Sequence, residues 1–304
     1  MIACDMSPEV ARARAGGTPL VALESTIITH GLPHPQNLDI ARRIEAEIRA
    51  GGATPATIAV LDGRLKIGLE DTQLDDLAKA GDVRKLSRAD LPVAIATGAT
   101  GATTVAATMI AAHLAGIEVF ATGGIGGVHR GAETSFDISA DLHELAQTPV
   151  TVVAAGAKAI LDLPKTLETL ETLGVPVITF GQDAFPAFWS RDSGLAAPLR
   201  LDNPRDIARS HRTRGQMGLA GGQLIANPIP AADEIPRAEI DRAISTALGD
   251  AKTAGVLGKD VTPYLLDRMQ ALTQGRSVRA NIALVLNNAR LAARIATELG
   301  KIAT

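Results

Sequence analysis

The chain has 304 residues, of which 46% are hydrophobic and 21% are charged, a balance typical of a folded globular protein rather than a disordered one. Its 30 basic and 33 acidic residues give a net charge of −3, which argues against a nucleic acid or an anionic membrane as partner. The single cysteine, Cys4, cannot form an internal disulfide, no apolar run is long enough to span a membrane, and the N-terminus has no hydrophobic signal core. We therefore expect a cytoplasmic protein.

Short runs of β-forming residues alternate with helical patterns along most of the chain, which predicts an α/β fold. The expected strands are Pro19–Leu23, Ala56–Leu61, Pro92–Thr97, Ile117–Ala121, Val150–Ala154, Val175–Phe180 and Gln223–Ala226. Between the first two, Gln36–Ala50 carries isoleucines at four-residue spacing and predicts an amphipathic helix. Asp62-Gly63 predicts a hairpin turn, so the sheet should be mixed rather than purely parallel.

The pattern becomes wholly helical after Pro236, with helices expected over Ala238–Ala254, Thr262–Leu272 and Ser277–Leu299. We find no repeat or shift in composition, so we predict that residues 1–304 form a single domain. Its expected architecture is a three-layer α/β/α arrangement with a mixed central sheet and a helical C-terminal layer. Because aromatic residues make up only 2% of the chain while glycine occurs 29 times, the core should consist of small aliphatic side chains on closely packed backbones.

Three glycine-rich segments, Thr97–Thr104, Thr122–Gly131 and Ala155–Lys158, directly follow predicted strands. In open α/β sheets, ligands bind beyond the carboxyl ends of the strands, where glycine turns and helix N-termini expose N–H groups. None of the three segments has the Walker pattern or the dinucleotide-binding pattern. A single glycine cluster is most simply a tight turn, but three at one sheet edge, among His, Arg, Asp and Lys residues, favour a phosphate or sugar site.

Two charged residues near the strand ends are candidates for catalysis. Lys158 lies among alanine, glycine and isoleucine residues, which favours a neutral amine that attacks carbonyls; alternatively, it is a lysine at a helix start whose charge reaches solvent. Glu24 follows the first strand and is either a helix-capping partner or a general acid.

Metal binding and hydrolase chemistry have less support in the residues. No zinc-binding pattern and no GxSxG elbow occur, although Asp137 could hold a hard cation together with waters and substrate oxygens. Four of the few aromatic residues cluster in the sequence and form either a buried patch or a lid over an apolar or flat ligand: Phe180, Phe185, Phe188 and Trp189.

Six segments carry a longer and more specific pattern: Ala22–Gly31, Phe120–Gly131, Phe136–Leu142, Ala155–Lys158, Ala226–Pro230 and Leu286–Ala289. The chain resembles, through these segments, the pseudouridine-5'-phosphate glycosidase family, which also includes the indigoidine-biosynthesis A proteins. The resemblance covers nearly the whole chain. It implies the reversible conversion of pseudouridine 5'-phosphate and water to uracil and ribose 5-phosphate, and it implies a homotrimer.

The resemblance also implies roles for particular residues. Lys158 would form a Schiff base with C1 of the opened ribose, Glu24 would donate a proton, and Asp137 would hold Mn²⁺, largely through waters. The substrate-binding positions implied in this way are Lys85, Val105, Ser139, Ala140, Asp141 and Asn281. We further expect substrate contacts from Thr122 and His129 in the second glycine-rich segment.

Two other functions are compatible with these residues. One is a non-catalytic sensor of sugar phosphates, against which the presence of both Glu24 and Lys158 argues. The other is a related activity in an indigoidine-type pigment pathway.

Overall fold

A computed structural model describes residues 4–256 and 261–302 of the chain. These residues form an eleven-stranded, mostly parallel sheet in the order β10-β9-β11-β8-β7-β2-β3-β4-β1, with β6 paired to β3 and β5 paired to β6. The strands are β1 (Cys4–Met6), β2 (Leu20–Leu23), β3 (Thr54–Leu61), β4 (Arg64–Ile67), β5 (Arg84–Leu86), β6 (Gly101–Thr103), β7 (Val119–Ala121), β8 (Thr151–Ala154), β9 (Val177–Phe180), β10 (Leu199–Leu201) and β11 (Gln223–Ala226).

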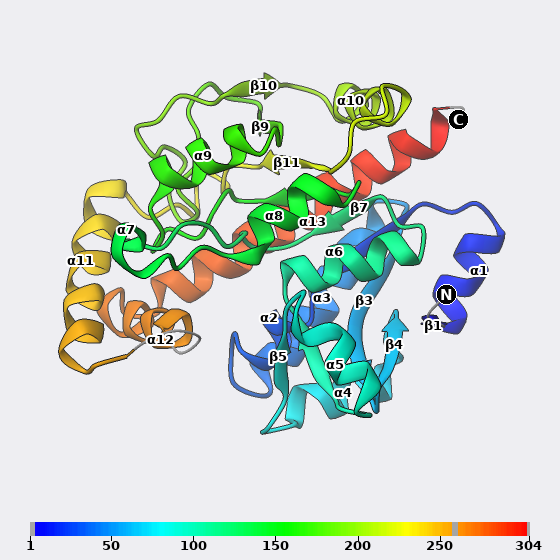
Figure 1. Cartoon of the computed structure of the whole chain (residues 1–304), viewed down its shortest axis with the longest axis horizontal. Helices are drawn as coiled ribbons and strands as arrows, with labels where there is room; N and C mark the ends of the chain where they lie inside the picture. The colour runs from blue at the N-terminus through cyan, green and yellow to red at the C-terminus, as the bar shows by residue number, and fades with distance from the viewer. Residues whose placement is uncertain (1–3, 257–260, 303–304) are drawn as a thin grey trace.

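Helices cover both faces of this sheet (Figure 1). The described helices are α1 (Pro8–Ala15), α2 (Thr26–Thr29), α3 (Gln36–Ala50), α4 (Asp71–Lys79), α5 (Asp90–Ala96), α6 (Val105–Leu114), α7 (Ala132–Ser135), α8 (Ala140–Gln147), α9 (Leu163–Thr172), α10 (Pro204–Gln216), α11 (Arg237–Thr253), α12 (Val261–Leu272) and α13 (Arg276–Lys301). Helices α3, α10 and α13 pack together on one face, while α6, α8 and α9 pack on the other. The predicted α/β fold with helices on both sides of a mixed sheet is therefore confirmed.

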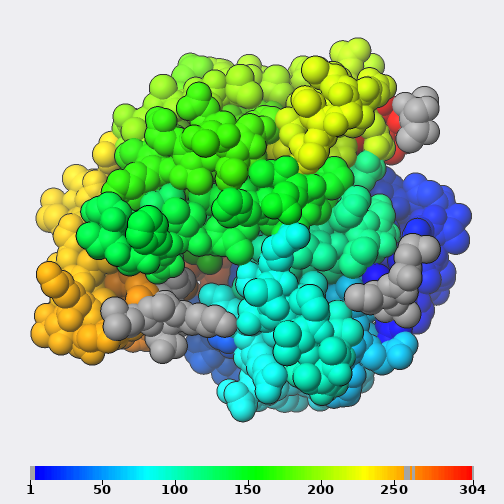
Figure 2. All heavy atoms as spheres, in the orientation of Figure 1, coloured from blue at the N-terminus to red at the C-terminus, as the bar shows by residue number. Residues whose placement is uncertain are grey.

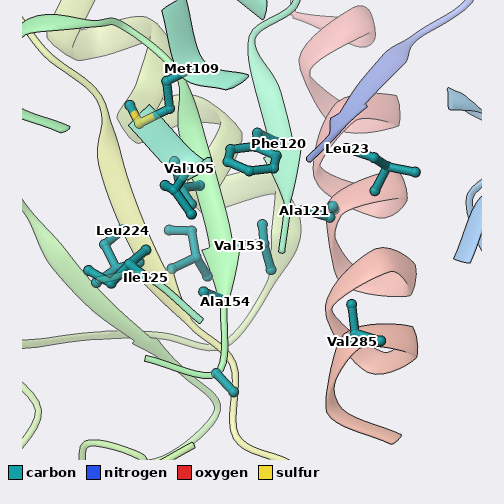
Figure 3. Close-up of a cluster of buried hydrophobic side chains, with 14 of the residues drawn as sticks. Leu23, Val105, Met109, Phe120, Ala121, Ile125, Val153, Ala154, Leu224 and Val285 are labelled. Carbon is teal, nitrogen blue, oxygen red and sulfur yellow. The ribbon is translucent and has the colours of Figure 1, made fainter. Parts of the chain in front are cut away.

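The core consists mainly of small aliphatic side chains, as the composition predicts. Figure 3 shows Val105 and Met109 of α6 on one side of the central strands and Val285 of α13 on the other. The long helix α13 approaches its neighbours closely, because a Cβ atom placed on Gly51 at the end of α3 would lie 2.5 Å from the Cβ atom of Ala293. Close packing of this kind compensates for the scarcity of aromatic rings.

The strand predicted over Pro92–Thr97 is wrong, because these residues belong to helix α5 and its C-terminal cap. The β-branched residues suggested a strand, but burial follows the helical period: Leu91 and Ala94 are buried and Val93 is 57% exposed. Pro92 is tolerated because it lies in the first turn of the helix, where its missing N–H has no intrahelical partner. The first glycine-rich segment therefore follows a helix and contains β6.

The predicted hairpin is confirmed, since β3 and β4 pair antiparallel across Asp62-Gly63. The other predicted strands correspond to β2, β3, β7, β8, β9 and β11, with ends that differ by a few residues. Strands β2, β7, β8 and β11 are mutually parallel neighbours, so their carboxyl ends meet at one edge of the sheet. None of the described helices is both long and apolar enough to cross a membrane.

Glu45 of α3 makes a pH-dependent contribution to the free energy of unfolding. The carboxylate is buried against β3, where it accepts hydrogen bonds from Thr57 Oγ1 (2.6 Å) and Arg49 Nη2 (3.1 Å). Burial outweighs these bonds and raises the pKa of Glu45 above its ordinary value of 4.5. A carboxyl group with a raised pKa stabilises the folded state fully below its unfolded pKa and loses that contribution as the pH rises through its folded pKa.

We expect Glu45→Gln to remove this pH dependence, because the amide keeps an oxygen for Thr57 and does not ionise. The free energy of unfolding of the variant, relative to the unsubstituted protein, should increase between about pH 4 and pH 7. Urea unfolding at each pH measures this difference. A difference that is constant over this range would show that Glu45 does not titrate with a raised pKa.

Candidate active site

The candidate site lies at the carboxyl ends of β2, β7 and β8, which carry Glu24, Thr122 and the loop to Lys158. The segments after β7 and β8 are joined by backbone hydrogen bonds: Ala155 donates to Gly123 (2.9 Å) and Lys158 donates to Ile125 (3.1 Å). The parallel register thus brings together side chains that are far apart in the sequence. The predicted meeting of the second and third glycine-rich segments at one sheet edge is confirmed.

Glu24 is buried at this edge, with 8% of its surface exposed. Its Oε1 accepts a hydrogen bond from the hydroxyl of Thr122, and its Oε2 accepts one from the hydroxyl of Thr26. Both partners are hydroxyl groups rather than helix N–H groups, so the carboxylate does not act as a backbone cap for α2. Its position is instead fixed at the wall of a cavity.

The loop that carries Lys158 depends on glycine. Gly156 has a φ of +81°, a conformation that side chains rarely adopt, and a Cβ atom there would lie 3.0 Å from the carbonyl oxygen of Pro186. Around Lys158, the alanines 155, 157 and 159 and Ile160 are buried, whereas Lys158 itself is half-buried and reaches the cavity. The lysine therefore lies in the apolar surroundings that the sequence predicts.

In the second glycine-rich segment, Gly126 lies very close to the side chains of Ser139 and Asp141. A Cβ atom on this residue would lie 2.2 Å from Ser139 Oγ and 2.8 Å from Asp141 Oδ2. The backbone N–H of Gly126 donates to Asp141 Oδ2 (2.8 Å), and that of Ala106 donates to Asp141 Oδ1 (2.9 Å). Asp141 therefore binds the loop to the first turn of α6, and both of its oxygens already have backbone partners.

Two cavities adjoin at this site and share Glu24, Thr26, Lys85 and Lys158. The first, of about 250 Å³, is mostly apolar; its further lining includes His30, Leu32, Thr122, Gly123, Gly124, Phe188, Trp189, Gln270, Ser277, Asn281, Leu284 and Val285. The second, of about 300 Å³, is more polar; its further lining is Ser87, Asp90, Thr104, Val105, Gly126, His129, Asp137, Ser139, Asp141 and Leu161. Figure 2 shows the surrounding surface, with the green α8–α9 region above the cyan α4–α5 region.

All but one of the predicted site residues line these cavities. Ala140, the first residue of α8, is half-buried and lines neither cavity, whereas its sequence neighbours Ser139 and Asp141 line the second. Some of the residues that the prediction lacks come from α2, α12 and α13, and Thr26 is an example. Its position two residues after Glu24 was the one signal available for it.

Lys85 and Lys158 line both cavities, and they affect the pKa values of two histidines there. Burial lowers the pKa of His129, and Lys158 and Lys85 lower it further against the opposing effect of Asp137. Burial, followed by Lys85, also lowers the pKa of His30. Both histidines therefore favour the neutral form at neutral pH.

The second cavity fits a hard divalent cation held by a single carboxylate. Asp141 is occupied by backbone N–H groups, and Asp90 accepts a hydrogen bond from the N–H of Ser87 (2.9 Å). The side chain of Asp137 is 43% exposed, and its Oδ2 lies 3.8 Å from Nδ1 of His129. No group of three or more His, Cys, Asp or Glu side chains suited to a metal occurs among the described residues, so an ion at Asp137 would keep most of its waters.

The aromatic cluster is both buried and part of the site. Phe185, Phe188 and Trp189 are almost fully buried, as expected for a buried aromatic patch. Phe188 and Trp189 also form part of the wall of the first cavity. Their rings meet edge to face, with centroids 5.1 Å apart and an interplanar angle of 70°. Nε1 of Trp189 donates a hydrogen bond of 2.6 Å to Oδ1 of Asn281.

A buried amide network supports the loop from behind. Asn288 of α13 donates through Nδ2 to the carbonyl oxygens of Thr122 (2.8 Å) and Gly123 (3.3 Å), and its Oδ1 accepts from Asn227 (3.0 Å). Asn288 thereby joins α13 to the ends of β7 and β11. The sequence signal for this network is an amide on an otherwise apolar helix stripe, which also carries Asn281.

Comparisons with known proteins agree over nearly the whole chain. The family model described as indigoidine synthase A like protein matches residues 9–298. The chain is 69% identical over 296 residues to a pseudouridine-5'-phosphate glycosidase of Paracoccus denitrificans, covering 97% of each chain. It is also 69% identical to one of Roseobacter denitrificans, covering 96% of this chain and 94% of the relative.

Two solved structures have the same fold. The prealnumycin C-glycosynthase AlnA in complex with ribulose 5-phosphate is 38% identical, with a TM-score of 0.91 and coverage of 98% of this chain and 97% of that one. An indigoidine synthase A-like protein from Thermotoga maritima is 34% identical, with a TM-score of 0.89 and the same coverage. Fold and site together define an α/β protein with a lysine and a glutamate between two adjoining cavities. The chain belongs to the indigoidine synthase A like family.

Proposed function

We propose that the chain cleaves the carbon–carbon glycosidic bond of pseudouridine 5'-phosphate, reversibly, to give uracil and ribose 5-phosphate. The observation that carries the proposal is the position of Glu24 and Lys158, which are shared by a mostly apolar cavity and a more polar one. A substrate with a flat base at one end and a phosphate at the other would place its glycosidic carbon at this junction. The names of the relatives that are 69% identical support the same substrate.

In the proposed arrangement, the base lies in the first cavity against Phe188 and Trp189, and the phosphate lies in the second. Lys85 offers the phosphate a positive charge, and the hydroxyl groups of Thr104 and Ser139 offer hydrogen bonds. The complex of AlnA with ribulose 5-phosphate supports a sugar phosphate as ligand of this fold.

In the reaction, Glu24 protonates the ring oxygen of the ribose as the ring opens, and the amine of Lys158 bonds to C1. Glu24 then recovers a proton from the lysine nitrogen and passes it to C5 of uracil. The bond between C1 of the sugar and C5 of uracil breaks while the lone pair of the lysine nitrogen forms a C=N bond to C1. Because C5 has already been protonated, uracil leaves as a neutral molecule and not as an unstable carbanion. Water hydrolyses the protonated imine to ribose 5-phosphate and restores the amine of Lys158, and the proton released in this step returns to Glu24.

Glu24 is held in place for this exchange by two hydroxyl groups. Thr122 donates to Oε1 and Thr26 donates to Oε2, and among the described residues no ion pair to Glu24 is found. The apolar wall formed by Phe188 and Leu284 excludes water from the base side of Lys158.

We further propose that Asp137 holds Mn²⁺ in the second cavity, mostly through waters. A bound Mn²⁺ would neutralise charge on the substrate phosphate and order the water around it. The chain's own contribution is the exposed carboxylate of Asp137 with His129 beside it.

Asp137→Asn is expected to weaken Mn²⁺ binding strongly, because the ion loses its single anionic ligand. Titration of Mn²⁺ with the purified protein, followed by electron paramagnetic resonance, measures the affinity without reference to turnover. Asp141→Asn is the matched variant: its oxygens serve backbone N–H groups, so it should affect stability more than metal binding. Equal Mn²⁺ affinity in Asp137→Asn and the unsubstituted protein would contradict the assignment.

The proposed assembly is a homotrimer, on the basis of the family resemblance, and the proposed location is the cytoplasm, on the basis of the sequence features described above. Light scattering on the purified protein tests the first, and cell fractionation tests the second.

Release of uracil from pseudouridine 5'-phosphate tests the proposed function directly. The release of uracil is followed by absorbance, with and without Mn²⁺, and ribose 5-phosphate is measured separately. The two products should form in equal amounts. Binding of the sugar phosphate without turnover would support the sensor instead. Turnover with another aromatic base in place of uracil would support a related activity of the pigment-pathway type.

A further inference from the structure

The wall of the first cavity contains an amide whose orientation is chemically fixed. An indole N–H can only donate a hydrogen bond, so the atom of Asn281 that lies 2.6 Å from Trp189 Nε1 must be the amide oxygen. The amide nitrogen then lies on the other branch of the side chain. Among the described residues, no hydrogen-bond acceptor is found for this Nδ2.

The opposite orientation of the amide is costly. If the amide turned over, its NH₂ group would face the indole N–H, and two donors would be left without acceptors. Trp189 is only 1% exposed, so water cannot replace the lost partner. The edge-to-face contact with Phe188 and the surrounding core hold the indole ring in place. Asn281 is therefore locked with its oxygen toward Trp189.

Asn281 is half-buried and lines the same cavity as Lys158, Phe188 and Trp189. Since its oxygen already accepts from Trp189, the polar atom without a partner among the described residues is the donor Nδ2. The other uncharged polar side chains of this wall differ in this respect. The hydroxyls of Thr26 and Thr122 donate to Glu24, and the hydroxyl of Ser277 and the amide of the exposed Gln270 can each present either a donor or an acceptor. None of these groups is fixed as a donor toward a ligand.

We propose that Trp189 determines base specificity by holding Asn281 as a hydrogen-bond donor. The site then accepts a pyrimidine ring with a carbonyl oxygen at that position and rejects a ring with an amino group there. Trp189 is a positioning residue, because it acts on the base through Asn281. This inference rests on the proposed function and specifies which feature of the base the site recognises.

The test compares pseudouridine 5'-phosphate with two analogues in which an amino group replaces the carbonyl oxygen at C2 or at C4. We expect the unsubstituted protein to prefer the natural substrate over one of these analogues by about 10- to 100-fold in kcat/KM, the effect of one mismatched buried hydrogen bond. Trp189→Phe keeps an aromatic ring beside Phe188 and removes the N–H. In this variant the amide can turn freely, so the preference should fall to within a few-fold.

The values of kcat/KM for the individual substrates distinguish a loss of the positioning of Asn281 from general damage to the site. With Trp189→Phe, kcat/KM for the disfavoured analogue should rise, whereas a merely structural role would lower it for every substrate. Leu284→Val is the matched control: it alters the apolar wall of the same cavity and keeps Trp189, Phe188 and Asn281, so the ratio between substrates should stay unchanged. An unchanged ratio in Trp189→Phe would overturn the proposal.

Because Trp189 is buried, a second variant keeps the test decisive if Trp189→Phe does not fold. Asn281→Asp retains an acceptor for the indole and replaces the amide nitrogen with an acceptor oxygen. The preference should then shift toward the amino analogue, and a preference that stays with the carbonyl would overturn the proposal. Failure of the unsubstituted protein to release uracil from pseudouridine 5'-phosphate would instead contradict the proposed function, so the two failures are distinct.

Discussion

Lys158→Arg is expected to reduce the release of uracil by on the order of 10⁴-fold or more, as the loss of a covalent nucleophile does in other enzymes. Arginine keeps the positive charge and most of the length of the side chain, but its guanidinium stays protonated and cannot form an imine. Steady-state rates with pseudouridine 5'-phosphate measure the effect. Circular dichroism and thermal unfolding should show an intact fold, because the side chain of Lys158 is half-buried and lies in a loop.

Lys85→Arg is the matched control for this prediction. Lys85 lines the same two cavities as Lys158, but its proposed role is to offer charge to the phosphate. Arginine can fill that role, so we expect a change in KM that exceeds the change in kcat. A large loss of kcat in Lys85→Arg, with activity retained in Lys158→Arg, would mean that Lys85 is the nucleophile and that Lys158 is not.

Glu24→Gln is expected to reduce kcat by about 10²- to 10⁴-fold, the usual contribution of a general acid–base group. Glutamine keeps the shape of the side chain and can still bond to the hydroxyl groups of Thr26 and Thr122, but it cannot transfer a proton. Binding of ribose 5-phosphate should change little, because the proposed contacts to its phosphate come from Lys85, Thr104 and Ser139 and not from Glu24.

Thr122→Val separates positioning of the carboxylate from proton transfer. This variant removes one hydroxyl from Glu24 and leaves the carboxylate itself in place. Its loss of kcat should therefore be smaller than that of Glu24→Gln. Near-normal turnover in Glu24→Gln would give Glu24 a packing role. A loss of stability of several kcal/mol in this variant would mean that its kinetics do not report on the chemistry.

The central part of the fold could be predicted because its sequence pattern is local. Buried strands such as Val150–Ala154 are short apolar runs, and the Asp62-Gly63 turn specifies its own hairpin. The segment at Pro92–Thr97 could not be assigned in this way, since β-branched residues in a short helix resemble a strand until their burial is known. Strands β5 and β6 were missed because each has three residues and takes its structure from its neighbours.

The candidate site was predictable where its residues follow strands. Glu24 and Lys158 lie beyond the ends of β2 and β8, and parallel strands bring such positions together. The role of Trp189 depends on a contact with a segment far away in the sequence, and periodicity carries no information about it. For Asn288, periodicity marks an amide on an apolar stripe but does not reveal its partners Thr122 and Gly123. Ala140 shows the converse: adjacency to Ser139 and Asp141 in the sequence does not bring it to the cavity wall.

The central claim is that Lys158 bonds covalently to the sugar, and borohydride trapping tests it most directly. The purified protein is incubated with ribose 5-phosphate, reduced with borohydride, digested and mapped by mass spectrometry. The account predicts a reduced pentose phosphate adduct on Lys158, with Lys85 unmodified and no adduct in Lys158→Arg. An adduct on Lys85, or uracil release by a protein in which no lysine can be trapped, would contradict the account.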